Sequence, residues 1–508
     1  MRRAILIGTF TLLVVGSIGA LRPGSQHTAQ MPPAWVDGGR PSAARGLDPT
    51  GRTPGRRGLL ALLRNREFDR LGHLVESQQS QFEADARSER ALAETLDAFG
   101  IADPSITPLL DEWVTSHPHA WAPLLVRSRH RLARAGDEGD DADETTTVEA
   151  RRTALRSAID DANAALELNH RLAQAYVTLI ASTRASGDRE ASARFAGLGL
   201  AIAPASVVLR VQHATSLLPR WGGSYEAVAA FAKASQAFAD QAPALRTLMG
   251  FADWDRGRAL SRQRQFAEAL ASFDRAVATG DWWRFYRDRG ETYVRMQRHA
   301  AALDDLDRAV ALAPDEADAV TLRAEALAGL GRRSDALQAA QRAAELDPTN
   351  HELGWFRRHG AEDAVAQGWD FIRTHDLRAA IERYTWADEL AGGHAEARYW
   401  RGRAYLQQND STHALADFEE AIHLDPHYVE SYRRIDGILS QQKDWDGLTR
   451  LWSQYIELEP GSADGWVARS GAYHQKGDRS AALADAREAC HLGNPASCDL
   501  VGRSSHGG

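Results

Sequence analysis

Lysine is almost missing from this chain of 508 residues. It occurs only as Lys233, Lys443 and Lys476, so 57 of the 60 basic residues are arginine, which favours a GC-rich bacterial source. Residues 1–57 hold eight arginines and two acidic residues, a net charge of +6. Since the net charge of the whole chain is −9, the remaining residues carry −15. Because binding to a phosphate backbone needs a basic face, the acidic body argues against nucleic acid as a partner.

Sequence motifs of the common enzyme classes are also absent. The chain has no HExxH pair of zinc proteases, no GxxxxGK[ST] phosphate loop and no GxSxG nucleophile elbow. His117 and His119 flank Pro118, a spacing at which two histidines can chelate, but we interpret the segment as a turn between two helices. We therefore expect no catalytic residue, no cofactor and no bound metal.

The first 21 residues have the pattern of a targeting segment. Arg2 and Arg3 precede Ala4–Leu21, an uncharged and mostly apolar run that is suited to a secretory signal or a short membrane anchor. Ser17 and Gly19 are small enough for the −3 and −1 positions of a cleavage site. We expect a periplasmic or secreted protein, with membrane contact through residues 4–21 if the segment is not cleaved; a buried N-terminal helix is the alternative.

Residues 22–57 and 58–249 differ in composition. The first segment is rich in proline and glycine and predicts a flexible linker. The second mixes charged and apolar residues at helical spacing, which predicts an α-helical domain with a possible degenerate repeat at 173–206. Residues 136–149 read as a solvated acidic loop. A calcium site there would use Asp137, Asp140, Asp141 and Asp143, but their spacing does not match the calcium-loop motif.

From residue 250 the sequence repeats, mostly with a period of 34 residues. Pro314 and Pro348 are one period apart, as are Pro426 and Pro460. The interval from Ala324 to Gly368 is 44, which indicates an insert at 351–360. Such a pattern predicts pairs of antiparallel helices that must stack to bury their apolar faces. Each unit has a small residue at an equivalent position, and the last two units match this pattern less well. These positions are Gly257, Gly290, Ala324, Gly368, Gly402, Asp436 and Ser470.

These residues resemble the tetratricopeptide repeat family, over about seven units in residues 250–494. The resemblance implies an all-α solenoid of helical hairpins that binds a protein or peptide in a concave groove lined by the first helix of each unit. Arginines and aromatic side chains are suited to such contacts. The implied groove residues are Trp254, Arg258, Arg262, Arg284, Arg287, Glu291, Arg295, Glu325, Trp369, Tyr399 and Arg403. That the arginines are merely solvated is the alternative.

The segment Pro219–Glu226, PRWGGSYE, stands out in the N-terminal half together with Asn65–Arg70. Both are similar to a bacterial domain of unknown function that precedes helical repeats, which implies an all-helical domain and supplies no activity. Gly222 and Gly223 predict a tight turn, and Ser224 predicts the N-cap of a following helix. A phosphate cradle is the alternative interpretation of the two glycines.

Only two cysteines are present, Cys490 and Cys498, on either side of an Asn-Pro turn. In an oxidising compartment they predict a disulfide that joins a C-terminal cap and tail, residues 495–508, to the last repeat. The alternatives are a metal site with His491 and two free thiols.

Two functions remain after these observations. The first is a non-enzymatic scaffold of the bacterial cell envelope that binds a protein or peptide in the repeat groove. The second is an enzyme or ligand-binding protein with a site in residues 58–240 and the repeats as a docking arm.

Overall fold

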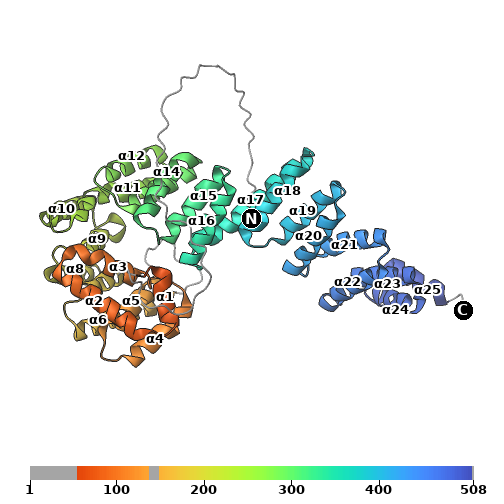
Figure 1. Cartoon of the computed structure of the whole chain (residues 1–508), viewed down its shortest axis with the longest axis horizontal. Coiled ribbons are helices and arrows are strands. Elements are labelled where there is room, and N and C mark those ends of the chain that lie inside the picture. The colour runs from red at the N-terminus through yellow and green to blue at the C-terminus, as the bar shows by residue number, and fades with distance from the viewer. Residues whose placement is uncertain (1–53, 137–147, 506–508) are drawn as a thin grey trace, which may run out of the picture. The chain divides into compact units, whose positions relative to one another are not determined.

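The computed structural model describes residues 54–136 and 148–505, and these ranges are helical throughout (Figure 1). They contain 25 α-helices and five short 3-10 helices, and no strand occurs within them. The all-α fold expected from the sequence is confirmed. The expected leader at 1–21, nearly all of the linker and the candidate calcium ligands Asp137, Asp140, Asp141 and Asp143 lie outside the described residues.

Ten α-helices precede the predicted repeats. The first begins at Arg56, so helical structure starts inside the expected linker at 22–57. Leu63, Leu71 and Trp113 are almost fully buried in one core that extends over α1–α9. The helices are α1 (Arg56–Arg64), α2 (Phe68–Ala84), α3 (Glu89–Asp97), α4 (Thr107–Ser116), α5 (Trp121–Arg134), α6 (Val148–Leu168), α7 (Ala173–Ala185), α8 (Arg189–Ile202), α9 (Val207–Ser216) and α10 (Tyr225–Ser235).

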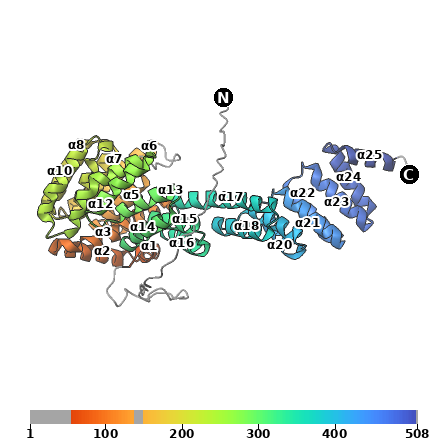
Figure 2. The same ribbon diagram turned by 90° about the horizontal axis from the view of Figure 1, so that it is seen from above.

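Seven helical hairpins follow, the number that the sequence period predicts (Figure 2). Each hairpin packs against the next along the chain. They are α11 (Phe251–Arg262) with α12 (Phe266–Val277), α13 (Trp283–Arg295) with α14 (His299–Leu312), α15 (Ala317–Gly329) with α16 (Arg333–Leu346), α17 (His351–Arg373) with α18 (Leu377–Ala391), α19 (Ala395–Gln407) with α20 (Ser411–Leu424), α21 (Val429–Gln442) with α22 (Trp445–Leu458), and α23 (Ala463–Lys476) with α24 (Arg479–His491).

Close helix contacts explain the repeated small residues. A Cβ atom on Gly257 would lie 2.8 Å from the ring of Phe273, and one on Gly402 would lie 2.8 Å from the ring of Phe418. The partner follows sixteen residues later in both pairs, so any larger side chain would push the two helices of the hairpin apart.

The last two hairpins replace the small residue by a polar contact at the same place. The Asp436 Oδ2 atom accepts a hydrogen bond of 2.6 Å from the Trp452 indole, again sixteen residues later. The Ser470 hydroxyl donates to the Ala482 carbonyl oxygen at 2.7 Å. Packing is therefore maintained where the sequence pattern departs from small residues.

The turn inside each hairpin contains one residue in the left-handed conformation. In two of the seven hairpins this left-handed turn residue is a glycine, Gly331 or Gly477. The other five turns use a residue with a Cβ atom at this position, for example Gln297 at φ 57° and Lys443 at φ 60°. Gly187 adopts the same conformation between α7 and α8, so hairpin geometry of this kind already occurs before residue 250.

Buried arginine–aspartate pairs fasten consecutive hairpins. The Arg401 guanidinium donates two hydrogen bonds to Asp417 on the other helix of its hairpin, at 2.8 and 2.6 Å, and a third to Thr385 of the preceding hairpin at 3.1 Å. Arg469 repeats this arrangement with Asp485 and Ser453. One side chain thus fixes both the hairpin and its neighbour.

The expected insert and the expected cap both have defined structures. Residues 351–360 form the beginning of α17, which is 23 residues long compared with 13 for α13. A final helix, α25 (Pro495–Ser505), packs against α24, and a disulfide joins Cys490 to Cys498. Within the described ranges, none of the helices combines the length and apolar character needed to cross a bilayer.

Candidate partner-binding face

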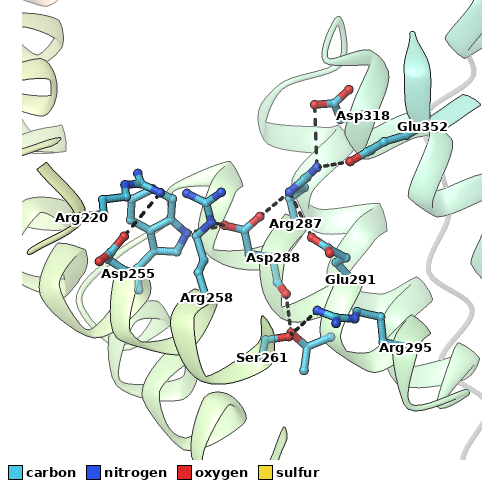
Figure 3. A network of polar contacts seen from close by, with 12 residues as sticks. Arg220, Asp255, Arg258, Ser261, Arg287, Asp288, Glu291, Arg295, Asp318 and Glu352 are labelled. Atoms are coloured by element: carbon cyan, nitrogen blue, oxygen red, sulfur yellow. Dashed lines mark hydrogen bonds and ion pairs between the residues drawn. The ribbon is translucent and has the colours of Figure 1, made fainter. Parts of the chain in front are cut away.

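Arg287 on α13 lies at the centre of a polar network formed mainly by the first helices of the hairpins (Figure 3). Its guanidinium donates hydrogen bonds to Asp288 at 2.8 Å, Glu291 at 3.1 Å and Glu352 at 2.9 Å, and lies 3.8 Å from Asp318. Burial would lower the pKa of Arg287, but these carboxylates raise it well above its ordinary value. The side chain is therefore a fixed cation that is engaged inside the molecule.

Asp288 links Arg287 to the preceding hairpin. Its Oδ2 atom accepts a hydrogen bond of 2.6 Å from the Trp254 indole and lies 3.5 Å from the Arg258 Nε atom. Burial alone would raise the pKa of Asp288, but Arg287 and Arg258 lower it below its usual value. Arg258 also lies over the Trp254 ring, 5.2 Å from its centroid.

Two further contacts extend the network, as Figure 3 shows. Arg220, just before α10, forms an ion pair of 3.7 Å with Asp255 of α11. At the other end, the Arg295 guanidinium donates to the Ser261 hydroxyl at 3.3 Å. The cavity enclosed by this network measures only about 100 Å³, which leaves space for little more than a few water molecules.

Glu325 on α15 lies beyond the network and is a half-buried carboxyl group. Burial and the nearby Glu291 raise the pKa of Glu325 to about 7. No described residue forms an ion pair with it. Its charge at neutral pH is therefore less stable than that of an ordinary surface glutamate.

A larger cavity, of about 600 Å³, lies between α17 and α19. Trp369 lines it and is 38 % exposed, although its ring also packs, at a tilt, against another aromatic ring. Its ring centroid lies 3.7 Å from that of Trp400. Glu362 and Glu396 add two carboxylates to the lining, and Arg373 adds a guanidinium that already forms an ion pair with Asp370. We call these residues the Trp369 cavity.

Aromatic packing supports this cavity from behind. Tyr399 is only 5 % exposed and packs its ring against Trp400 and Phe418. The Arg403 guanidinium lies 4.4 Å from the centroid of the Trp400 ring. These contacts fix the orientation of Trp400 and, through it, that of Trp369.

The eleven residues expected in the groove are thus divided among several environments. Arg258, Arg262, Arg287, Glu291 and Arg295 line the small cavity. Trp254, at 2 % exposure, and Tyr399 are buried supports and do not line a surface. Arg403 covers Trp400, and Trp369 lines the large cavity. Arg284 lies against Trp283 and near Asp97 and Glu316, while Glu325 lines neither cavity and lies near Glu291.

Several residues of this face were not expected from the sequence. Glu352 belongs to the insert, and nothing in its local pattern marks it as the partner of Arg287, 65 residues earlier. Asp288 directly follows Arg287, and Glu396 lies three residues before Tyr399, but neither was among the residues expected in the groove. Trp400 directly follows the expected groove residue Tyr399 but was not itself expected there.

The other candidates from the sequence have simple structural roles. His117 lies in the turn between α4 and α5 and contacts Asp69 at 3.1 Å, and the described residues include no cluster of three potential metal ligands. Gly222 has φ 82°, consistent with the expected tight turn, and Ser224 caps α10 by accepting a hydrogen bond from the Ala227 amide at 3.1 Å.

Comparison with known proteins identifies the repeats. Residues 287–351 and 365–429 match the tetratricopeptide repeat family. No curated protein matches the chain. The solved structure of YrrB, described as a TPR protein with an unusual peptide-binding site, is 22 % identical over 36 % of this chain and 90 % of that one, with a TM-score of 0.24.

Two other solved structures have a similarly low sequence identity and TM-score. The TPR2AB domain of yeast Sti1, in complex with pHSP90, is 18 % identical over 45 % of this chain and 98 % of that one, with a TM-score of 0.21. Part of a TPR repeat-containing protein from Cytophaga hutchinsonii is 18 % identical over 48 % and 98 %, with a TM-score of 0.24. The family match and the seven hairpins together show that this chain contains tetratricopeptide repeats in an all-α array, a fold that suggests a scaffold for protein–protein interaction.

Proposed function

We propose that the chain is a non-enzymatic scaffold that holds a partner protein through a peptide segment bound at the Trp369 cavity. The observation that carries this proposal is the exposed Trp369 ring in a cavity of about 600 Å³. The side chains that contribute most of the binding energy at protein interfaces are enriched in tryptophan, tyrosine and arginine. The Arg287 network is a weaker candidate, because its charges are already paired and its cavity is small.

The lining of the cavity favours a cationic side chain on the partner. A lysine or arginine over the face of Trp369 gains about 0.5–2 kcal/mol from the ring alone. Glu362 and Glu396 add charge-assisted hydrogen bonds, and Val365 supplies apolar surface for an aliphatic stem or a neighbouring residue. We therefore expect the bound segment to contain arginine or lysine next to an apolar residue.

Selection from a displayed library of short random peptides on the full chain tests this function. Peptides with arginine or lysine beside an apolar residue should be enriched, and Trp369→Ala should weaken their binding by about tenfold or more. Trp355→Ala is the matched control, because Trp355 is also exposed on α17 but does not line the cavity. Enrichment of acidic peptides, or equal binding by Trp369→Ala and Trp355→Ala, would contradict the proposal.

The cell envelope is the proposed location. Residues 1–21 have the sequence pattern of an export segment, and the pairing of Cys490 with Cys498 agrees with an oxidising compartment. Fusing residues 1–57 to a reporter enzyme that is active only after export tests this location in bacterial cells. The activity of the reporter should depend on Ala4–Leu21. An inactive fusion would contradict the envelope location and would leave the proposed peptide binding unaffected.

A further inference from the structure

The first helices of the described chain contact hairpins that lie at least 222 residues later in the sequence. Helix α1 contacts α16, and the Arg57 Nη2 atom lies 2.9 Å from the Glu345 Oε2 atom. Arg90, at the beginning of α3, donates a hydrogen bond of 3.2 Å to the carbonyl oxygen of Leu312 on α14. These contacts close the chain on itself between α1–α3 and α14–α16.

Four charged side chains lie together beside this contact. Arg56 of α1 lies near Asp97, the last residue of α3, and near Glu316, which directly precedes α15. The Arg56 guanidinium also donates to the backbone carbonyl oxygen of Asp97 at 3.5 Å. Arg284 of α13 lies near the same two carboxylates. A carboxylate of the N-terminal helices is thus placed near an arginine that the sequence assigned to the partner-binding groove.

The contact is polar, whereas consecutive hairpins pack through apolar cores. One apolar core extends over α1–α9 and another over α13–α19, and in the ranges that the structure describes the two cores share no residue. The side chains of Arg57 and Glu345 are 68 % and 33 % exposed, and that of Arg90 is 69 % exposed. An ion pair as exposed as this one shifts an equilibrium by about fivefold at most. The contact can therefore open without disrupting either core.

We propose that the contacts of Arg57 and Arg90 form an autoinhibitory latch, which holds α1 and α3 against α14 and α16 and keeps Asp97 beside Arg284. While the latch is closed, an acidic group of a partner has to compete with Asp97 for Arg284. Salt should open the latch, because the screening length falls from about 30 Å at 0.01 M to about 3 Å at 1 M. The latch does not involve the Trp369 cavity and does not depend on the proposed function.

Energy transfer between two dyes on the full chain measures the opening of the latch. One dye is attached to Ala61→Cys on α1 and the other to Gln338→Cys on α16, both at exposed positions. Labelling without a reductant keeps the native disulfide intact. Transfer should be high at about 0.01 M salt and fall at about 1 M. Glu345→Arg places a like charge opposite Arg57 and should raise the ratio of open to closed molecules by about fivefold or more at low salt.

Exchanging the two charges, by Arg57→Glu together with Glu345→Arg, should restore the transfer, because the pair again has opposite signs. Asp307→Arg is the matched control, because it reverses the charge of an exposed aspartate that pairs with Arg323 outside the latch, and it should leave the transfer unchanged. Transfer that stays constant in salt, or in Glu345→Arg, would overturn the latch. A charge exchange that does not restore the transfer, or an equal loss in Asp307→Arg, would also overturn it, because general destabilisation would then explain the signal.

Discussion

Methionine in place of Arg287 should destabilise the repeats by about 3–4 kcal/mol at neutral pH. Methionine keeps part of the side-chain volume but leaves Asp288, a carboxylate that is only 6 % exposed, with Arg258 as its remaining cation at 3.5 Å. Removing one partner of a buried ion pair costs about 3–5 kcal/mol. The contacts to Glu291 and Glu352 add little, because those carboxylates are 35 % and 40 % exposed and each contributes below about 1 kcal/mol.

The pH dependence of this loss distinguishes lost charge pairing from lost packing. In the unaltered chain the pKa of Asp288 is lowered, so its contribution to stability is present above its unfolded pKa of about 3.9 and is lost as the pH falls through the folded pKa. Without Arg287, burial should raise the pKa of Asp288, and the variant should lose stability as the pH rises above about 4. The difference between the two proteins should therefore be larger at pH 7 than in acid.

Urea unfolding followed by far-ultraviolet circular dichroism, at about pH 4.5 and about pH 7, measures this difference. Arg323→Met is the control, because among the described residues Arg323 forms its ion pair with Asp307 alone, and both side chains are more exposed, at 31 % and 51 %. That variant should lose less than about 1 kcal/mol at either pH. A loss for Arg287→Met that is no larger than the control, or that is the same at both pH values, would refute the reasoning.

Three further changes have defined expectations. Glu325→Gln should raise stability by about 2 kcal/mol near pH 8 and have little effect near pH 4, because a carboxyl group with a raised pKa destabilises the fold as it ionises; equal changes in melting temperature at both pH values would contradict this. Gln297→Gly should stabilise by about 0.5–1 kcal/mol in urea unfolding, since φ is 57° there, and a loss would show that this turn carries no strain. Changing Cys490 and Cys498 to serine should cost about 2–3 kcal/mol and speed hydrogen exchange in α25, whereas unchanged exchange would mean that packing alone holds this helix.

The hairpin array was predictable from the sequence because its main constraint is local. Gly257 and Phe273, like Gly402 and Phe418, are sixteen residues apart and must touch for the hairpin to close, so the small residues keep their phase. The same spacing joins Arg401 to Asp417 and would have predicted the buried ion pairs as well.

The candidate face was predictable only in part, because its contacts join distant segments. Arg287 was expected to face a partner, but its hydrogen bond to Glu352 depends on how the insert continues into α17. Exposure was also unpredictable from position alone: Trp254 and Trp369 both occupy first helices, yet one is buried against Asp288 and the other lines a cavity.

The long helix α17 connects the two parts of the candidate face. At its N-terminus, Asn350 caps the helix and also donates a hydrogen bond to Asp318 of α15 at 2.6 Å. Two residues later, Glu352 accepts a hydrogen bond from Arg287 of α13. Trp369 lies on the same helix about 25 Å further along, at the rise of about 1.5 Å per residue. Because a helix is stiff over this length, the polar network, together with the packing of α17 against α18, helps to position Trp369 beside Trp400. In the proposed function, the buried charges would act by holding the helix that carries the exposed ring, without contacting the partner themselves.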